Sequence, residues 1–458
     1  MARFSDLSAE VVDLILSHLH PPPLRHTSTE ADLAAQHAAS APAFRALALT
    51  SRALAGPATA HLYATLSLRL AYPRGGGDGD GDAFALLCRT LREAPPARAA
   101  QLRSHVRAAA LWTYWNQGAL TADAVALLNG LPRVRDLQLR TFGGLVYGDA
   151  HARALGCVRA RALPRLASLY LNCRAWVGDV VRLVVLTRVE AVRVTSVGMG
   201  RPGGRGVVRD VPGRKEVLRD LRIDEEVEWD GLGVLLRSIG GCRRLGLGGS
   251  WAVKSEDGVP EQTASRRRIR EALEPARDVL ELLHLRCMNW ILDDTTALDL
   301  HGFSVLKVLS VDSRCFFSQG QGKRDISSWL PPCLEYLEVV FNYTDAVAIF
   351  ADYWPREDDH QWLVDIARNK HTSYPQLRHL HVRDLWEQQE KNLTIGALRY
   401  WHVPVDVEAE FSMAEIELRV VIRAIGQEPC QTPKCIVLPD KDLNDENLDE
   451  DTWAEYFA

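Results

Sequence analysis

The feature that most constrains the fold of this chain is a short apolar pattern that recurs along most of its length. Apolar residues occupy the first, fourth and sixth positions of this pattern, which occurs ten times. The sixth positions of successive occurrences are 23 to 43 residues apart, and most gaps are shorter than 30. The occurrences are Val106/Ala109/Leu111, Val134/Leu137/Leu139, Leu166/Leu169/Leu171, Val189/Val192/Val194, Leu218/Leu221/Ile223, Cys242/Leu245/Leu247, Leu280/Leu283/Leu285, Leu306/Leu309/Val311, Leu334/Leu337/Val339 and Leu377/Leu380/Val382. Such a repeat predicts similar units stacked along an axis, which allows 458 residues to share one elongated core.

The last two apolar positions of each unit predict a β-strand, because side chains two residues apart on a strand point to the same face. Helices are predicted between strands over residues 121–128, 231–239 and 346–353. Parallel strands joined by covering helices form an α/β solenoid. The spacing resembles that of leucine-rich-repeat proteins. Most units lack the Asn or Cys that completes a regular repeat, so we expect an irregular solenoid with parallel strands and outer helices.

The first seventy residues predict a small helical module instead. Residues 4–19 place apolar side chains on one helical stripe, and the three prolines at 21–23 end this helix. Further helices are expected over the alanine-rich residues 31–41 and over 44–57, followed by a helical stretch to residue 63. A module of this size cannot bury its own stripe, so we expect a partner to cover it. Alternatively, the helices only cap the solenoid, since solenoids need capping units.

The module resembles the F-box of fungal proteins that combine an F-box with leucine-rich repeats. The resemblance covers residues 4–68 and is carried by residues 7–19, 47–57 and 62–68; Ser8 stands where the family usually has proline. It implies docking on the Skp-family adaptor of a cullin-RING ubiquitin ligase. The positions that match the docking stripe are Leu7, Val11, Ile15, Leu19, Leu47, Leu49 and Leu54.

The composition along the chain predicts four parts. They are the F-box-like module (1–70), a Gly-, Asp- and Pro-containing linker with a helix (71–100), the solenoid (101–425) and an acidic, flexible C-terminal tail (426–458). The basic run at residues 266–270 lies among acidic residues and is interpreted as a solvated helix face.

Charge and cysteine content restrict the possible partners and compartments. The net charge of −5 provides no overall basic field for nucleic acid. The nine cysteines form no disulfide framework, which indicates reduced thiols in an intracellular compartment. The N-terminus lacks the layout of a signal peptide, and no apolar run is long and uncharged enough to span a bilayer. We therefore expect a protein of the cytoplasm or nucleus that binds neither nucleic acid nor membrane.

The motifs that resemble cofactor or catalytic sites are each incomplete. Residues 198–203 match a dinucleotide fingerprint, but Pro202 prevents the helix that would bind the pyrophosphate. Three aspartates within 78–82 begin like a calcium loop that lacks its required Gly and Glu. The elbow-like residues 248–252 lack the closing glycine of a nucleophile elbow. We expect no enzymatic activity, no cofactor and no metal.

Aromatic residues just beyond the strand ends are the candidates for binding a target, because solenoid loops project there and aromatic side chains are enriched in binding hot spots. They are Trp112, Tyr114, Trp115, Trp176, Trp251, Trp290, Phe316 and Phe317. The expected function is a substrate-recognition subunit of an SCF-type cullin-RING ubiquitin ligase, which raises the effective concentration of a target's lysine. The alternative is a leucine-rich-repeat scaffold that works without a ligase.

Overall fold

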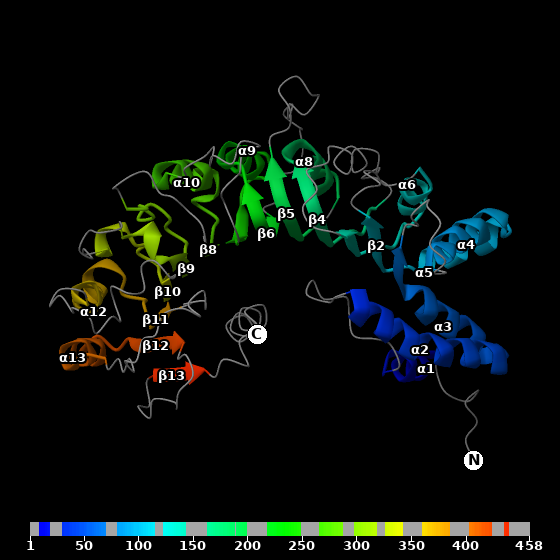
Figure 1. The fold of residues 1–458 in the computed structure, drawn as a ribbon, viewed down its shortest axis with the longest axis horizontal. Coiled ribbons are helices and arrows are strands. Elements are labelled where there is room, and N and C mark those ends of the chain that lie inside the picture. Colours follow the sequence, from blue (N-terminus) through cyan, green and yellow to red (C-terminus); the bar gives the residue numbers. More distant parts are fainter. Residues whose placement is uncertain are drawn as a thin grey trace, which may run out of the picture. The chain divides into compact units, whose positions relative to one another are not determined.

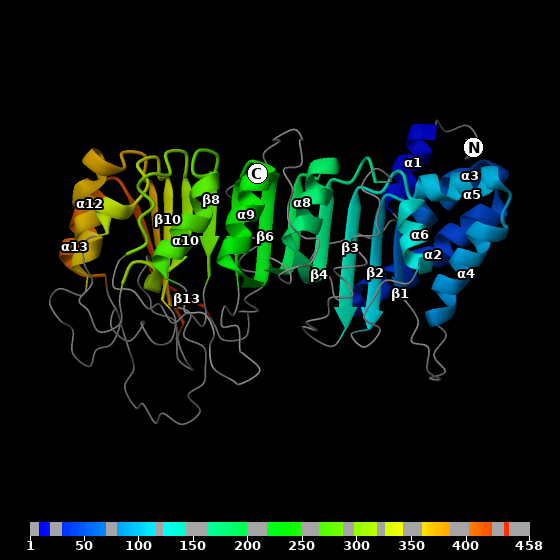
Figure 2. The ribbon, with the colours of Figure 1, turned by 90° about the horizontal axis from the view of Figure 1, so that it is seen from above.

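The structure, a computed structural model, shows an α/β protein that divides into two compact units, residues 1–218 and 219–458 (Figure 1). In both units, strands alternate with helices, and the described helices that follow the strands cover one face of them (Figures 1 and 2). The residues described are 9–18, 30–69, 80–114, 122–142, 163–187, 189–198, 218–248, 265–286, 297–317, 326–341, 360–384, 403–423 and 435–438.

The first unit begins with three helices, α1 (Ala9–His18), α2 (Glu30–Thr50) and α3 (Arg52–Ala64). The predicted separation of helices at 31–41 and 44–57 is wrong, because α2 continues through Pro42. Alanines on both sides of this proline favour the helix enough to tolerate the one backbone hydrogen bond it removes. The break comes instead at Ser51, whose φ of −144° and ψ of 126° are extended.

The strands of the first unit are adjacent in chain order and pair in parallel. They are β1 (Thr65–Arg69), β2 (Ala108–Tyr114), β3 (Asp136–Phe142), β4 (Ser168–Trp176) and β5 (Ala191–Gly198). The accompanying helices are α4 (Asp80–Glu93), α5 (Pro96–His105), α6 (Ala122–Asn129) and α8 (Val177–Leu186). Because β1 pairs with β2, the sheet begins within the first seventy residues, directly after the helical stretch that was predicted to end at residue 63.

The second unit continues this alternation, with strands again adjacent in chain order. Its strands are β6 (Leu218–Val227), which starts at the last residue of the first unit, β7 (Cys242–Leu247), β8 (Leu282–Leu285), β9 (Val308–Asp312), β10 (Tyr336–Phe341), β11 (His379–Asp384), β12 (Glu417–Arg423) and β13 (Cys435–Leu438). Its helices are α9 (Trp229–Ile239), α10 (Arg266–Leu273), α12 (Gln361–Ser373), α13 (Val405–Met413) and the short 3-10 helices η4 (Glu274–Ala276), η5 (Ser313–Cys315) and η6 (Ser327–Trp329). The tail prediction is wrong at β13, which pairs in parallel with β12.

The apolar repeat is confirmed as the core of both units. All ten predicted strands form, and every apolar residue of the ten occurrences is at most 7% exposed. In register, Leu137 pairs with Leu169, and Leu309 pairs with Leu337. Equivalent apolar side chains therefore stack from strand to strand on the helix-covered face. The helices predicted over 121–128 and 231–239 form as α6 and α9, and 346–353 lies outside the described residues.

Backbone hydrogen bonds also join neighbouring strands just before the strands begin. In the first unit, the Arg135 N–H donates to the Arg107 carbonyl at 2.7 Å, and the Ala167 N–H donates to the Arg135 carbonyl at 2.7 Å. In the second unit, the Lys307 N–H donates to the Glu281 carbonyl at 2.9 Å, and the Glu335 N–H donates to the Lys307 carbonyl at 2.8 Å. Neighbouring strands within each compact unit are therefore connected through main-chain groups. The side chains at these positions are free to vary.

None of the helices within the described ranges is both long and apolar enough to cross a membrane.

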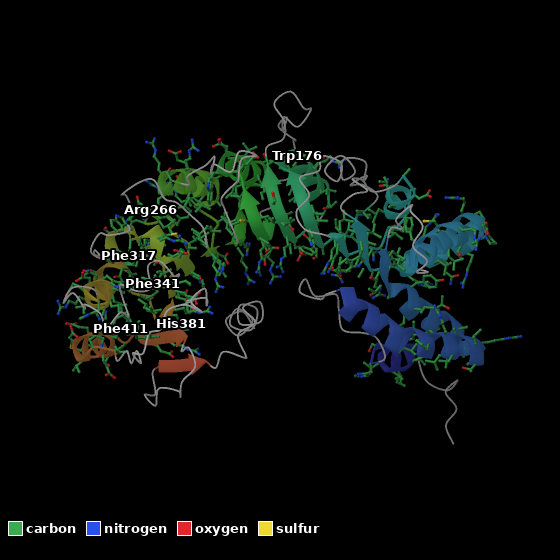
Figure 3. The ribbon with its side chains drawn as sticks, in the orientation of Figure 1. Trp176, Arg266, Phe317, Phe341, His381 and Phe411 are labelled. Carbon is green, nitrogen blue, oxygen red and sulfur yellow. The ribbon has the colours of Figure 1, made fainter. Side chains whose placement is uncertain are left out.

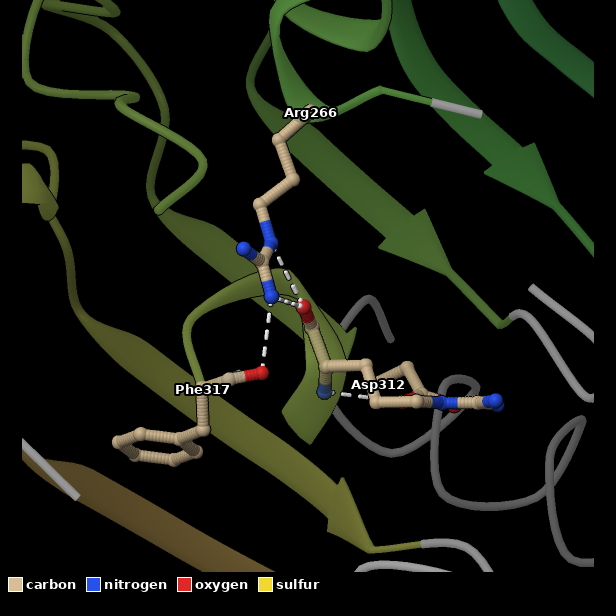
Figure 4. A network of polar contacts seen from close by, with 4 residues as sticks. Arg266, Asp312 and Phe317 are labelled. Carbon is tan, nitrogen blue, oxygen red and sulfur yellow. Dashed lines mark hydrogen bonds and ion pairs between the residues drawn. The ribbon is translucent and has the colours of Figure 1, made fainter. Parts of the chain in front are cut away.

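Arg266, the first residue of α10, is buried rather than solvated as the basic run predicted (Figure 4). Its Nε and Nη2 donate to the Arg314 carbonyl at 2.8 and 2.5 Å, and Nη2 also donates to the Phe317 carbonyl at 2.8 Å. The Arg314 N–H in turn donates to the Asp312 carboxylate at 3.0 Å. Arg266 thus satisfies carbonyl groups at the end of η5 and holds this segment against α10.

Truncating a stacked core side chain should destabilise the fold. We expect Leu309→Ala to lower the free energy of unfolding by about 2 to 5 kcal/mol, because it leaves a cavity in the core. Val405→Ala, at an exposed position of α13, should change this free energy by less than about 0.5 kcal/mol. Denaturant titration measures both, and equal effects of the two changes would contradict the proposed core.

The two neighbouring arginines of α10 provide a second test. Arg266→Met should lower the free energy of unfolding by about 2 to 4 kcal/mol, because it leaves buried carbonyl groups without donors. Arg267→Met should cost less than about 0.5 kcal/mol, since its ion pair with Glu271 is exposed. If thermal and denaturant unfolding do not distinguish the two variants, Arg266 has no special structural role.

Candidate functional site

The helical module has a small core of its own. Its buried residues are Val12, Leu16, Phe44, Leu54 and Ala58, with Leu47, Ala48 and Leu62 packed against them. The expectation that Leu54 faces an adaptor is therefore wrong, because this side chain is only 6% exposed. Leu47 is likewise partly covered by the core.

Helix α1 carries a second apolar stripe outside this core. Val11, Leu14 and Ile15 are 41%, 60% and 37% exposed, respectively. Their spacing of three and four residues places them on one side of the helix, about 130° from the buried pair Val12 and Leu16. The outer stripe is thus a continuous apolar surface that the described residues of the module leave accessible to solvent.

Three other residues were predicted to dock the adaptor. Leu49 of α2 is 87% exposed, so it is accessible as expected. Leu7 and Leu19 lie outside the described residues. The described docking candidates therefore divide into an accessible group, Val11, Ile15 and Leu49, and a covered group, Leu47 and Leu54.

The predicted recognition aromatics do not form one surface. Trp112, Phe316 and Phe317 are buried, so their expected role as loop contacts is wrong. Phe317 packs in the core with its ring 6.2 Å from Phe341 and 5.3 Å from Trp362 (Figure 3).

The other aromatic candidates are less completely described. Trp176 is half-buried where β4 meets α8 (Figure 3). The described part of the chain does not include Trp115, Trp251 or Trp290. It also does not include the side chain of Tyr114.

In the first unit, the strand face opposite the helices carries a stack of rings and guanidinium groups. Trp112, Arg140, Tyr170 and Arg193 come from β2, β3, β4 and β5, one residue per strand. The Arg140 Cζ lies 4.8 Å from the ring centre of Trp112 and 5.0 Å from that of Tyr170. The Arg193 Cζ lies 5.4 Å from the Tyr170 ring centre. Each contact is a cation–π interaction, and the four side chains alternate ring and charge. We call these four residues the arginine–aromatic stack.

Polar neighbours orient this stack. The Trp112 Nε1–H donates to Ser67 Oγ at 3.3 Å, and the Arg140 Nε–H donates to Gln138 Oε1 at 3.0 Å. One strand further, the Thr195 hydroxyl donates to Asn172 Oδ1 at 2.9 Å. These side chains lie between the two apolar residues of a strand or directly after them, so strand alternation brings them to one face.

In the second unit, the corresponding face carries a buried charged network centred on Glu338. The Ser310 hydroxyl donates to Glu338 Oε2 at 2.5 Å, and Arg383 Nη1 lies 3.1 Å from Oε1. Burial alone would raise the pKa of Glu338. The charges of Arg383 and Arg286 and the Ser310 hydrogen bond outweigh it and lower this pKa to about 2. The carboxylate is thus ionised at every physiological pH.

Histidines flank this network. Tyr336 Oη lies 2.8 Å from His381 Nδ1, and His381 projects away from the helix-covered face that holds Phe411 (Figure 3). Burial lowers the pKa of His381 to about 4. Burial and the charge of Arg286 also hold the pKa of His284 well below its usual value. Both rings are therefore neutral at pH 7, and Ser310 and Glu338 are too deeply buried to meet a substrate.

Sequence reasoning missed both polar surfaces, although their positions were readable. Each lies at the variable position inside an apolar-x-apolar pair or directly after the pair. Gln138 separates Leu137 from Leu139, and Glu338 separates Leu337 from Val339. Aligning the ten occurrences on their apolar residues would have placed these polar residues at equivalent positions of neighbouring strands, and so on one face of the sheet.

The described residues contain no group of three or more His, Cys, Asp or Glu side chains that could hold a metal ion. Four cysteines in this part of the chain, Cys88, Cys242, Cys315 and Cys333, are free thiols.

Comparisons with known proteins do not assign the chain to a family. No protein-family model matches it, and no curated protein matches it. The outer stripe of α1 and the two strand faces are therefore the features from which we infer a function.

The buried histidines predict a pH dependence of stability. Folding lowers the pKa of His381 from 6.5 to about 4. Between pH 6.5 and pH 4, His381 is therefore protonated in the unfolded chain and neutral in the folded chain. Stability should be full above pH 6.5 and decrease as the pH falls toward 4. We expect His381→Gln to flatten this decrease by about 1 kcal/mol per pH unit at most.

Denaturant titrations of both proteins between pH 7 and 4.5 measure this difference. His371→Gln, on the exposed surface of α12, is the control for replacing a histidine by glutamine. Parallel pH profiles for His381→Gln and the unaltered chain would show that His381 is not held neutral by the fold.

Proposed function

We propose that this chain is a substrate-recognition subunit of an SCF-type cullin-RING ubiquitin ligase. In this role, helices α1 to α3 dock a Skp-family adaptor, and through it a cullin, while the solenoid holds a target protein. The observation that supports the docking step is the outer stripe of α1. Val11, Leu14 and Ile15 remain exposed although the same helix already buries Val12 and Leu16.

Helix α1 has two apolar sides, and leaving the outer side exposed to water is unfavourable in free energy. Removing the exposed part of each outer side chain from water contributes on the order of 1 kcal/mol. Three such residues can supply the hydrophobic centre of a helix-binding interface. This supports a protein partner for the module more than a role as a cap, since a cap would turn its apolar side toward the repeats.

The chain itself would perform no chemistry in this role. It would act in the cytoplasm or nucleus by holding a target close to the ubiquitin-charged enzyme, which raises the effective concentration of the target's lysine. The strand face of the first unit suits the target-binding part of the task, because Arg193, the half-buried member of the arginine–aromatic stack, is held in place by the Tyr170 ring. Adaptor docking and target binding would then use chemically different surfaces, one apolar and one polar.

Adaptor binding gives the direct test. Val11→Asp combined with Ile15→Asp should weaken binding to a purified Skp-family adaptor by about a hundredfold, because two carboxylates would be buried without partners. Size-exclusion co-elution and titration calorimetry measure this loss. Val405→Asp combined with Met413→Asp makes the same change on two exposed apolar residues of α13, and it should leave binding intact.

Two results would contradict the ligase role. One is the absence of any complex between the unaltered chain and the adaptor. The other is a complex that survives the α1 changes while circular dichroism shows the variants folded. Either result would favour a scaffold whose N-terminal helices only cap the repeats.

A further inference from the structure

The segments that lead into the strands of the first unit carry an excess of positive charge. Those that end at the first residue of β2, β3 and β4 are residues 103–108, 131–136 and 163–168. Together they contain five Arg against one Asp, a net charge of +4. The equivalent segments before β8 to β11 contain three Lys and Arg against three Asp and Glu, over residues 277–282, 303–308, 331–336 and 374–379. The excess therefore belongs to the first unit and is not a general property of the repeat.

Parallel pairing places the three positive segments along one edge of the sheet. Because β2 pairs in parallel with β3, and β3 with β4, all three strands begin at this edge. The Arg135 N–H donates to the Arg107 carbonyl at 2.7 Å, so these two residues are neighbours directly before their strands. Arg133 and Arg165 occupy equivalent positions before β3 and β4. We call Arg107, Arg133, Arg135 and Arg165 the arginine edge.

The arginine edge is accessible and lacks compensating charge. All four of its residues are exposed. Within the part of the chain that the structure describes, none of their guanidinium groups forms a hydrogen bond or an ion pair. The one carboxylate of the three segments, Asp136, is half-buried and follows Arg135, so it offsets one of the four charges at most. Burial lowers the pKa of the nearby His105, and arginine charges, those of Arg133 and Arg107 among them, lower it further.

The second unit shows how the same positions can be neutralised. Lys307, Glu335 and Arg378 stand directly before β9, β10 and β11, and their charges alternate in sign. The Lys307 Nζ lies 3.2 Å from Glu335 Oε1. In the first unit, Arg107 and Arg135 instead place like charges on neighbouring strands, which is unfavourable for folding. The fold gains no stability from this arrangement, which points to a role in binding.

We propose that the arginine edge binds a segment of a protein partner that is rich in Asp and Glu. Each planar guanidinium group can donate two parallel hydrogen bonds to a carboxylate. Neighbouring strands are about 4.8 Å apart, so the edge from β2 to β4 spans about 10 Å, which matches about three residues of an extended chain. That this partner is a target of the ligase rests on the proposed function, whereas its acidic character rests on the arginine edge alone.

Nucleic acid fits this surface less well. Proteins that bind single strands combine positive charge with aromatic side chains on which bases stack. The three segments contain no Phe, Trp or Tyr, and the exposed residues beside the arginines include Pro132 and Pro164. A duplex is bound through many phosphate contacts, and the net charge of −5 on the whole chain opposes the approach of such a polyanion.

The test uses the full chain and a short fluorescein-labelled peptide of Asp, Glu and Gly. Fluorescence anisotropy should show binding that weakens with salt. Arg107→Gln combined with Arg135→Gln should lower affinity by about tenfold or more, because it removes two charged donors. Lys307→Gln combined with Arg378→Gln removes the same charge from the same positions of the second unit, and it should change affinity by less than about twofold.

A charge reversal separates binding from folding. Arg135→Glu places a carboxylate beside Arg107, as Glu335 stands beside Lys307. It should therefore lower the affinity for the peptide by more than about tenfold without lowering the unfolding temperature. Anisotropy and a thermal melt measure the two effects on the same sample.

Several outcomes would overturn this inference. They are no binding of the peptide, equal loss for the two double variants, or tighter binding of a single-stranded RNA that depends on the same arginines. Peptide binding that appears only after the acidic residues of 440–451 are changed to Asn and Gln would assign the edge to the chain's own tail instead. If the first double variant fails to fold, Arg133→Gln combined with Arg165→Gln should show the same loss. None of these readouts involves the adaptor, so the inference and the ligase role can fail separately.

Discussion

The structure depends on the lateral pairing of parallel strands that each send two apolar side chains into the same core. Backbone groups connect one strand to the next, as in the ladder through Arg107, Arg135 and Ala167, so the sheet grows without demanding particular side chains at these points. The apolar pairs, such as Leu309 and Val311, then stack on their equivalents and exclude water from the helix-covered face. Strand alternation leaves the intervening positions for other purposes.

This constraint explains why the strands were predictable and why some were missed. The ten occurrences became strands because each has two apolar residues in alternation. The strand β1 also fits the pattern through Tyr63, Leu66 and Leu68, but the helical signal before it concealed this fit. The strand β12 was missed because Glu415, with its φ of 53°, stands where the pattern has its first apolar residue. The short strand β13 has too few residues to show a pattern and depends on pairing with β12.

The candidate sites were less predictable, because burial is a tertiary property. Composition favours aromatic residues as contacts, yet Trp112 and Phe317 are drawn into packing with arginine or with other rings. On α1, the sequence gives one long run of apolar residues, and only the position of α2 and α3 decides that Val12 and Leu16 face inward while Val11 and Ile15 face outward. Polar side chains that meet across neighbouring strands are far apart in the sequence, by 28 positions between β2 and β3 and by 43 between β10 and β11, so no local pattern predicts these contacts.

We propose that a Skp-family adaptor covers the outer stripe of α1. Hydrogen–deuterium exchange on the full chain, with and without the purified adaptor, tests this proposal. We expect slower exchange of amides in residues 9–18 when the adaptor is present, with the strands β7 to β12 unchanged. Unchanged exchange in α1 despite complex formation, or slower exchange confined to the second unit, would contradict it.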